Sequence, residues 1–240
     1  MSMIYVEFID RDSTIPIEVF RQIGNQQSAW AEGADDRMIL QLGRTLRLGP
    51  KPSYLCFWEI SGIGRLDAWE EYFHSAAAVR NPRSQAMHRA MRIERAGIYD
   101  LLCRGPSLEM PLYVVHYCES TLVTDGELSK AYEDCTQMNP DLSPILLLRR
   151  LGRAGPDPGL LSIWGARSYV ALEPLLRGEA PSAWMLSILE SIAPSARKSC
   201  EGRMAICKPF AKRRIFEWHN VQLTPLLVEG WTNKGSTAVT

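Results

Sequence analysis

The chain has 240 residues, 46% of them hydrophobic, and its 27 Lys and Arg residues balance 27 Asp and Glu residues. This length allows one large domain or two small ones with a hydrophobic core, and zero formal net charge without a long basic run disfavours nucleic-acid binding. The first residues lack the pattern of a signal peptide, and no run approaches the roughly 18 apolar residues that a membrane helix needs. We therefore expect a soluble, cytoplasmic protein that binds neither nucleic acid nor membrane.

The first half of the chain predicts four strands with helices between them. Period-two alternation indicates the strands, and apolar residues three or four apart indicate the helices. In chain order we expect a strand at 3–9, a helix after the caps Ser13 and Thr14, strands at 37–47 and 53–60, a helix at 66–77, a short helix from Ser84 and a strand at 96–103. The sequence from Gly49 to Pro52 supplies the turn of a hairpin.

The second half predicts the same order of elements. We expect a strand at 111–118, a helix with a capping box from Thr124 to Glu127, a hairpin at 144–165, helices near 169–177 and 182–193, and a last strand at 216–226. The stretch 196–214 predicts no element, and the polar end is typical of a disordered tail.

A repeat explains why the two halves agree. Ile39–Trp58 aligns without a gap on Ile145–Trp164, with the Gly-Pro-x-Pro turn and the final tryptophan in both. Units of about 105 residues are domain-sized rather than solenoid repeats. We expect an N-terminal unit at 1–107, a C-terminal unit at 108–228 and a disordered tail at 229–240.

The order of elements in each unit is β-α-β-β-α-β, the ferredoxin-like plan. Such a unit covers one sheet face with helices, and its other face must be buried against something. The sister sheet is the obvious partner. The predicted fold class is therefore α+β, with two tandem ferredoxin-like units whose antiparallel sheets pack into one barrel around a central cavity.

This layout resembles the dimeric α+β barrel superfamily in its fused form, and most closely its NIPSNAP and EthD-like branches. The resemblance rests on SYLCFWEI, LDAWEEYF, NPRSQAMHRAM and the closing QLTPL. It implies a small hydrophobic or aromatic ligand. The superfamily includes cofactor-free monooxygenases, polyketide-processing enzymes, isomerases, lyases, haem proteins and binders, so the fold does not choose among them.

Metal and cofactor signals are absent from the sequence. The six cysteines form no CxxC pair and the four histidines no HxH or HExxH motif, so we expect free buried thiols and no zinc site. The haem branch of the superfamily uses an axial histidine in its C-terminal unit, and no histidine lies between Tyr117 and Trp218. GxSxG, P-loop and dinucleotide-binding motifs are also missing. We expect no cofactor.

Aromatic side chains dominate the predicted cavity. Alternation on the hairpin strands points Leu55, Phe57, Leu161 and Ile163 towards the helices and Cys56 and Ser162 inwards, although a register error of one residue reverses every such assignment. The side chains predicted to line the cavity as substrate-binding residues are Tyr5, Tyr54, Trp58, Tyr99, Tyr113, Tyr117 and Trp164. Such walls suit a flat hydrophobic substrate, and the alternative is that the rings simply fill the barrel.

Four polar residues in strand segments are candidates for acid–base chemistry. Glu7 interrupts an apolar strand, so it must be paired, protonated or functional, and Asp100 carries the same ambiguity. A histidine in a cavity is a natural proton shuttle, which makes His116 and His219 candidates, although His116 also fits a packed core histidine.

Arg44 and Arg150 occupy equivalent positions in the repeat. If they point inwards, they could bind a carboxylate or phenolate or stabilise an enolate. If they point outwards, they are solubility residues.

These residues favour a cofactor-independent lyase or isomerase that transfers a proton on a small aromatic or polyketide-like compound. A cofactor-free oxygenase and a non-catalytic binding or scaffold protein stay open, and so does a homodimer.

Overall fold

The computed structural model describes residues 2–12, 14–22, 36–45, 53–76, 85, 89–118, 124–138, 141–151, 159–173 and the backbone of 203–209. The predicted helix near 182–193, the predicted strand at 216–226 and the tail lie outside these residues. None of the described helices is long and apolar enough to cross a membrane.

The first unit follows the predicted order. Its elements are β1 (Met3–Arg11), a short helix at 17–22, β2 (Arg37–Arg44), β3 (Tyr54–Ile60), α2 (Gly64–His74) and β4 (Met91–Arg104). Strand β4 begins earlier than the expected 96–103. The strands of this unit lie in the order β4-β1-β3-β2, which is that of a ferredoxin-like unit.

The second unit repeats this plan. Its elements are β5 (Leu112–Cys118), α5 (Asp125–Met138), β6 (Leu142–Arg150), β7 (Leu160–Ala166), the 3-10 helix η1 (Val170–Leu172) and β8 (Arg203–Pro209). The capping box is present, since the Thr124 amide donates to Glu127 Oε2 over 2.9 Å and the Glu127 amide to Thr124 Oγ1 over 3.4 Å.

The last described strand of the second unit, β8, precedes the predicted strand at 216–226, which lies outside the described residues. Arg203–Pro209 pairs with both β5 and β2 and so completes the second sheet. The segment lies in the stretch for which the sequence predicted no element. Its short apolar centre, MAIC, has basic neighbours that hide the alternation.

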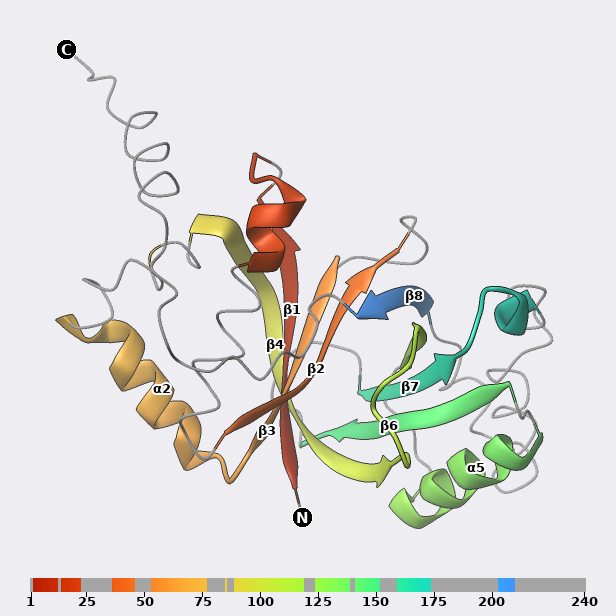
Figure 1. Ribbon diagram of the computed structural model, residues 1–240. Helices are drawn as coiled ribbons and strands as arrows, with labels where there is room; N and C mark the ends of the chain where they lie inside the picture. The colour runs from red at the N-terminus through yellow and green to blue at the C-terminus, as the bar shows by residue number, and fades with distance from the viewer. Residues whose placement is uncertain are drawn as a thin grey trace.

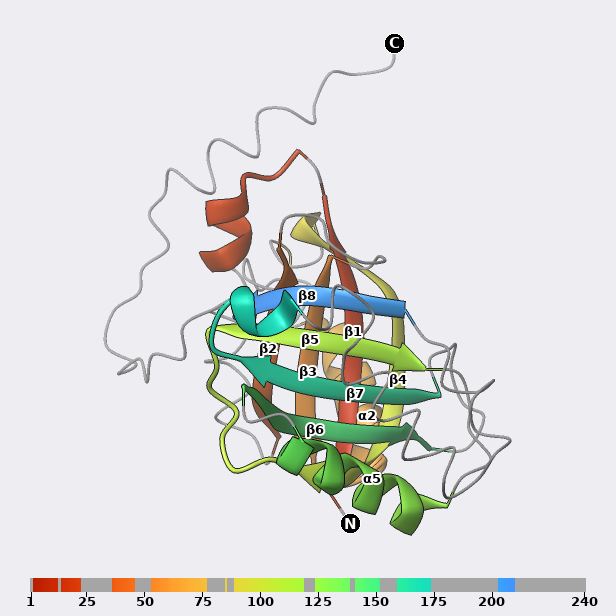
Figure 2. The ribbon, with the colours of Figure 1, turned by 90° about the vertical axis from the view of Figure 1, so that its right-hand side faces the viewer.

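The two sheets close into one barrel with the order β1-β3-β2-β8-β5-β7-β6-β4. Figure 1 shows α2 outside the first sheet and α5 outside the second. Figure 2 looks onto the second sheet, whose strands cross those of the first sheet behind it. The predicted fold class, two tandem ferredoxin-like units in one α+β barrel, is confirmed.

Each sheet therefore has two buried faces. One apolar cluster mixes residues from both units, among them Val6, Phe57, Val115 and Ile163, and it fills the barrel interior. A second cluster combines Cys56 and Trp58 of β3 with Phe20 and Trp69 of the helices, so it lies on the outer, helix-facing side of the first sheet. These two faces decide where each candidate side chain points.

Candidate functional site

Three polar side chains lie in a row on the helix-facing side of the first sheet. Cys56 of β3 is paired with Glu7 of β1 on one side and with Gln41 of β2 on the other. All three are buried. We call Glu7, Cys56 and Gln41 the polar row. Polar groups in such a place need hydrogen-bond partners, because burial without them costs free energy.

Glu7 is held by an indole. The Nε1 atom of Trp58 donates a hydrogen bond to Glu7 Oε2 over 3.0 Å, and Glu7 is only 7% exposed. A hydrogen bond to an ionised acceptor is stronger than one between neutral groups. The bond fixes the carboxylate within the row.

The other two members of the row contact each other. Gln41 Nε2 donates to Cys56 Sγ over 3.3 Å. The Gln41 Oε1 atom is buried and has no hydrogen-bond partner among the described residues. An acceptor in this position can receive a hydrogen bond from a bound molecule.

Aromatic rings surround the polar row. Trp69 of α2 packs edge-on against Tyr5, with ring centroids 5.3 Å apart, and against Trp58, at 5.7 Å. On the other side Phe20 contacts Tyr54 at 4.6 Å. Tyr5, Tyr54 and Trp69 keep part of their surface exposed, whereas Trp58 is buried. The accessible rings therefore lie around a buried carboxylate.

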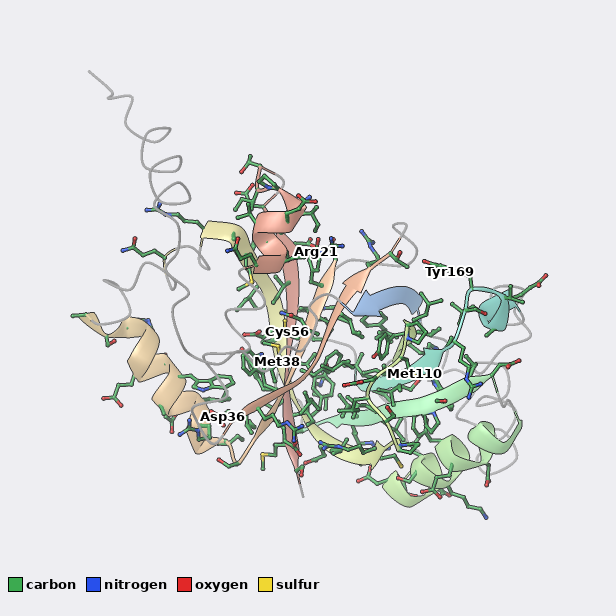
Figure 3. The ribbon with its side chains drawn as sticks, viewed as in Figure 1. Arg21, Asp36, Met38, Cys56, Met110 and Tyr169 are labelled. Atoms are coloured by element: carbon green, nitrogen blue, oxygen red, sulfur yellow. The ribbon has the colours of Figure 1, made fainter. Side chains whose placement is uncertain are left out.

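Asp36 anchors α2 over this part of the sheet. Arg65 donates from Nη2 to Asp36 Oδ2 over 2.8 Å and from Nε over 3.0 Å, and Trp69 Nε1 donates to the same oxygen over 3.0 Å. Asp36 is 1% exposed. Figure 3 shows Asp36 beside α2, with Met38 and Cys56 further along the sheet. The anchor sets the position of the Trp69 ring.

Burial sets the charge states of the neighbouring groups. Desolvation, and then the Glu7 carboxylate, raise the pKa of Tyr5 above its usual value. The same two causes, in that order, raise the pKa of the Cys56 thiol, and the Gln41 hydrogen bond opposes them. At neutral pH Tyr5 is thus a hydrogen-bond donor, and Cys56 is a thiol rather than a nucleophilic thiolate.

The predicted direction of the first-unit side chains is wrong. Tyr5, Glu7, Tyr54 and Trp58 face the helices, while Leu55 and Phe57, expected under the helices, fill the barrel. In the second unit Trp164 contacts Tyr132 of α5 at 4.4 Å, and its partner Ser162 shares that face. Leu161 and Ile163 again lie inside. Because both faces of each sheet are buried, alternation could not distinguish them.

The barrel interior contains the remaining predicted tyrosines. Tyr99, Tyr113 and Tyr117 belong to the mixed cluster inside the barrel and are almost fully buried. The Tyr113 hydroxyl donates to the Leu108 carbonyl over 2.6 Å and accepts from the Met110 amide over 2.8 Å. Tyr113 therefore stabilises the segment before β5.

Both repeat-related arginines point inwards. Arg150 is paired with Tyr99, and Arg44 is paired with Cys207, which in turn is paired with Tyr113. Cross-strand partners share a face of the sheet. The inward alternative is therefore the one observed, and the arginines are separated from the polar row by the first sheet.

The other predicted acid–base groups are not brought together with Glu7. His116 lies on the outer face of β5, opposite Ser162, and burial lowers its pKa to about 4. Asp100 is paired with Met3 and Arg149, on the opposite side of β4 from Tyr99. His219 lies outside the described residues. Glu7 is thus the predicted acid–base candidate that the structure surrounds with the predicted aromatic residues Tyr5, Tyr54 and Trp58.

Sequence reasoning missed Gln41, Asp36 and Trp69. Gln41 carries a detectable signal, because it interrupts the apolar run ILQL as Glu7 interrupts its own strand. Trp69 lies within the predicted helix at 66–77, and nothing in the sequence indicated that it would contact Tyr5 and Trp58. Nothing in the sequence marks Asp36 as part of the site, since its partners Arg65 and Trp69 lie about 30 residues further along the chain on α2.

The described residues do not fit a haem site in the barrel interior. His74 is exposed on α2, and His116 faces away from the interior. The described part of the chain also contains no group of three or more His, Cys, Asp or Glu residues placed to hold a metal ion.

No protein-family model and no curated protein sequence matches the chain. Among solved structures it is similar to a doubly substituted chlorite dismutase from Candidatus Nitrospira defluvii, with 8% identity, 87% of this chain and 92% of that chain covered, and a TM-score of 0.51. It is also similar to TA0507, provisionally a chlorite dismutase, with 8% identity, 87% and 95% coverage and a TM-score of 0.50. These likenesses show the fold alone, an α+β barrel of two ferredoxin-like units, and membership of the dimeric α+β barrel superfamily stays a prediction. The NIPSNAP and EthD-like subtype remains a prediction.

Proposed function

We propose that the protein is an enzyme that transfers a proton on a small aromatic or polyketide-like compound, without a cofactor, at the polar row. One observation carries this proposal: the buried Glu7 carboxylate is held by Trp58 Nε1 at 3.0 Å beneath partly exposed aromatic rings. A buried carboxylate that is held in one orientation beside a bound substrate can act as a general base. The site is therefore suited to remove a proton from a weakly acidic carbon.

Each neighbouring group has a role in this reaction. Glu7 takes a proton from the carbon next to a substrate carbonyl, and the electron pair of the broken C–H bond moves to the carbonyl oxygen. Tyr5, which stays protonated, donates a hydrogen bond to this oxyanion. Glu7 then returns the proton to another carbon, which gives an isomer, or a leaving group departs, which gives a lyase product.

The surrounding side chains favour an aromatic substrate with a hydroxyl group. The edge-on rings of Tyr5, Trp58 and Trp69 offer the apolar walls that flat rings prefer. The Gln41 Oε1 atom supplies an acceptor for a phenolic or enolic hydroxyl. Trp58 keeps Glu7 in place, so it is a positioning residue rather than a catalytic one.

The test is turnover of a panel of small aromatic and polyketide compounds, followed by mass spectrometry with and without oxygen. The decisive variant is Glu7→Gln, which keeps an oxygen acceptor for Trp58. We expect product without oxygen and a loss of about 10²- to 10⁴-fold in Glu7→Gln, the range for a general base. The matched control is Glu59→Gln, because Glu59 also lies on a strand of this sheet but pairs with Arg104.

Three results would contradict the proposal. Turnover that is equal in Glu7→Gln and in the unaltered protein removes Glu7 from the chemistry. A product that forms only with oxygen makes the protein a cofactor-free oxygenase. A ligand that is retained unchanged makes it a binding protein.

A further inference from the structure

Helix α2 packs loosely on the first sheet. Among its side chains that the structure describes none is buried, and Leu66 and Trp69 are half-buried. Helix α5, by contrast, buries Leu128 and Tyr132 and packs along β6 and β4, whereas the described residues of α2 contact no strand as extensively. Few buried apolar contacts mean a low free energy of local opening. Helix α2 therefore moves away from its sheet at a lower cost than α5.

A polar cluster holds α2 against the sheet. Asp36, just before β2, is 1% exposed and accepts hydrogen bonds from Arg65 Nη2 over 2.8 Å and from Trp69 Nε1 over 3.0 Å. Arg65 also donates from Nε over 3.0 Å, so the pair has the two-point geometry that arginine forms with carboxylates. We call Asp36, Arg65 and Trp69 the latch. It replaces the apolar contacts that α2 lacks.

A link that contains two glycines joins α2 to β3. Residues 61–64 read Ser-Gly-Ile-Gly, and a Cβ atom at Gly62 or Gly64 would meet nothing within 4 Å. Glycine adopts many backbone conformations at low cost, so such a link can absorb the dihedral changes of a hinge. In Figure 1 the end of α2 that follows this link lies beside the sheet, and the other end points away from the barrel.

The polar row lies next to this helix. Trp69 contacts the rings of Tyr5 and Trp58, with centroids 5.3 Å and 5.7 Å away, and Trp58 in turn donates to Glu7. Glu7 is 7% exposed and Cys56 is 1% exposed. A molecule as large as an aromatic ring therefore reaches the row only after a covering element has moved.

The other covering element is held more firmly. Phe20 of the short helix at 17–22 is 2% exposed, and Ile15 just before this helix is 1% exposed. Both belong to the apolar cluster on the helix-facing side of the first sheet. Of the two described elements that cover the polar row, α2 is therefore the one that costs less to move.

We propose that α2 is a hinged cover of the polar row and that the latch holds it closed. Opening carries the Trp69 ring away from the aromatic rings around Glu7, and closing restores the water-poor surroundings of the carboxylate. The cover follows from packing and hydrogen bonds alone. That a substrate enters by this route rests on the function proposed above.

The Cys56 thiol measures this opening, because it is a free thiol that is buried in the closed chain. The full chain is incubated with iodoacetamide at about pH 8, where an exposed thiol is partly ionised. Mass spectrometry of the digested chain gives the labelling rate at Cys56. Cys103, which is half-buried beside α5, serves as the internal standard. Labelling through local opening depends little on urea, whereas labelling through global unfolding rises steeply with it.

Asp36→Asn is the decisive variant, because it removes the charge of the latch and leaves Arg65, 28% exposed, in contact with water. We expect the labelling rate at Cys56 without urea to rise by about tenfold or more, since charge-assisted hydrogen bonds are lost. Arg65→Lys keeps the charge but not the fork, so the rise should be smaller. The labelling rate at Cys103 should stay the same in both variants.

Tyr132→Phe is the control for a general loss of stability. The Tyr132 hydroxyl shares its proton between the carbonyl oxygens of Leu146 and Ile163, so the change weakens the second unit, away from α2. The labelling rate at Cys56 without urea should not change, and urea unfolding of each variant shows that it is folded. The proposal is overturned if Asp36→Asn leaves this rate unchanged, or if Tyr132→Phe raises it as much.

Turnover distinguishes a failure of the cover from a failure of the proposed function. If Asp36→Asn speeds labelling at Cys56 but the unaltered chain turns over no compound of the panel, the cover is supported and the proposed function is not. If labelling is unchanged but turnover is present and is lost in Glu7→Gln, the function is supported and the cover is overturned.

Discussion

The indole Nε1 of Trp58 donates to Glu7 Oε2 over 3.0 Å, on the helix-facing side of the first sheet. The tryptophan at the equivalent place in the second unit, Trp164, donates instead to a neutral hydroxyl, Ser162 Oγ, over 3.3 Å. Both bonds are buried, so the duplication has kept the donor and changed the acceptor from a charged to a neutral group. This difference gives the two units different chemistry.

Replacing Trp58 with phenylalanine should therefore cost stability in a way that the same change at Trp164 does not. Trp58→Phe keeps an aromatic ring but leaves the buried Glu7 carboxylate without its indole donor, which costs about 1–3 kcal/mol. Trp164→Phe removes a bond between neutral groups and should cost about 1 kcal/mol less than Trp58→Phe. Urea unfolding at neutral pH measures both.

Adding Glu7→Gln to Trp58→Phe provides the control. The double variant should regain part of the loss, because no charge is then left buried without its donor. Equal losses for Trp58→Phe and Trp164→Phe would show that the charge of Glu7 is not stabilised by the indole.

Tyr132 connects α5 to the hairpin of β6 and β7. Its single hydroxyl proton is shared between the carbonyl oxygens of Leu146 and Ile163, and its oxygen accepts a hydrogen bond from the Ile145 amide over 3.0 Å. Tyr132→Phe leaves these buried backbone groups with one partner fewer, and we expect a loss of about 1–3 kcal/mol in the free energy of unfolding.

Tyr169→Phe is the matched control for Tyr132→Phe. The Tyr169 hydroxyl contacts Thr45 Oγ1 over 3.2 Å at the surface, where water replaces it, so its removal should cost less than about 0.5 kcal/mol. Chemical denaturation that finds similar losses for the two variants would contradict the role of Tyr132.

Burial of His116 should make the protein sensitive to acid. Desolvation lowers its pKa to about 4 in the folded state, below the value of 6.5 for the free side chain. Between these two values the unfolded state binds a proton and the folded state does not. Stability should therefore fall as the pH drops from about 6.5 towards about 4, by up to about 1.4 kcal/mol per pH unit from this residue.

His116→Gln isolates this contribution, because glutamine does not titrate. The difference in unfolding free energy between the variant and the unaltered chain should change between about pH 7 and about pH 5, with the unaltered chain losing more stability. A constant difference across this range would show that His116 takes up its proton in the folded state as readily as in the unfolded one.

The sequence was sufficient to predict the architecture because the repeat and the local patterns agree. The capping box at Thr124, the hairpin turns and the alternating strands each predicted an element that forms, and the duplication supplied the second sheet. Strand β8 was missed because its apolar centre is short and flanked by basic and proline residues.

The sequence predicted several residues of the candidate site, but not the face of the sheet on which they lie. Glu7, Tyr5 and Trp58 do share one face, as alternation requires. That face is covered by α2, because the more apolar set of Ile4, Val6 and Phe8 packs in the barrel. The face that meets the helices is decided by contacts with Trp69 of α2 and Phe20 of the short helix at 17–22. These residues lie on other elements than β1, so the pattern of the strand alone does not predict the contacts.

A last prediction concerns the close approach of two backbones where the chain leaves β4 beside the start of β6. The Gly105 amide donates to the Ile145 carbonyl over 2.9 Å, and a Cβ atom at this position would lie 1.7 Å from the Pro144 carbonyl oxygen. Alanine cannot fit without moving β6 away from β4, so Gly105→Ala should destabilise the fold by about 2 kcal/mol or more. Gly126→Ala is the matched control, because a Cβ there meets nothing within 4 Å in the first turn of α5. It should stabilise the protein by about 0.5–1 kcal/mol, since alanine is the better helix former. We expect the urea midpoint to shift in opposite directions in the two variants. An unchanged midpoint for Gly105→Ala would mean that the backbone at Gly105 is not in contact with β6.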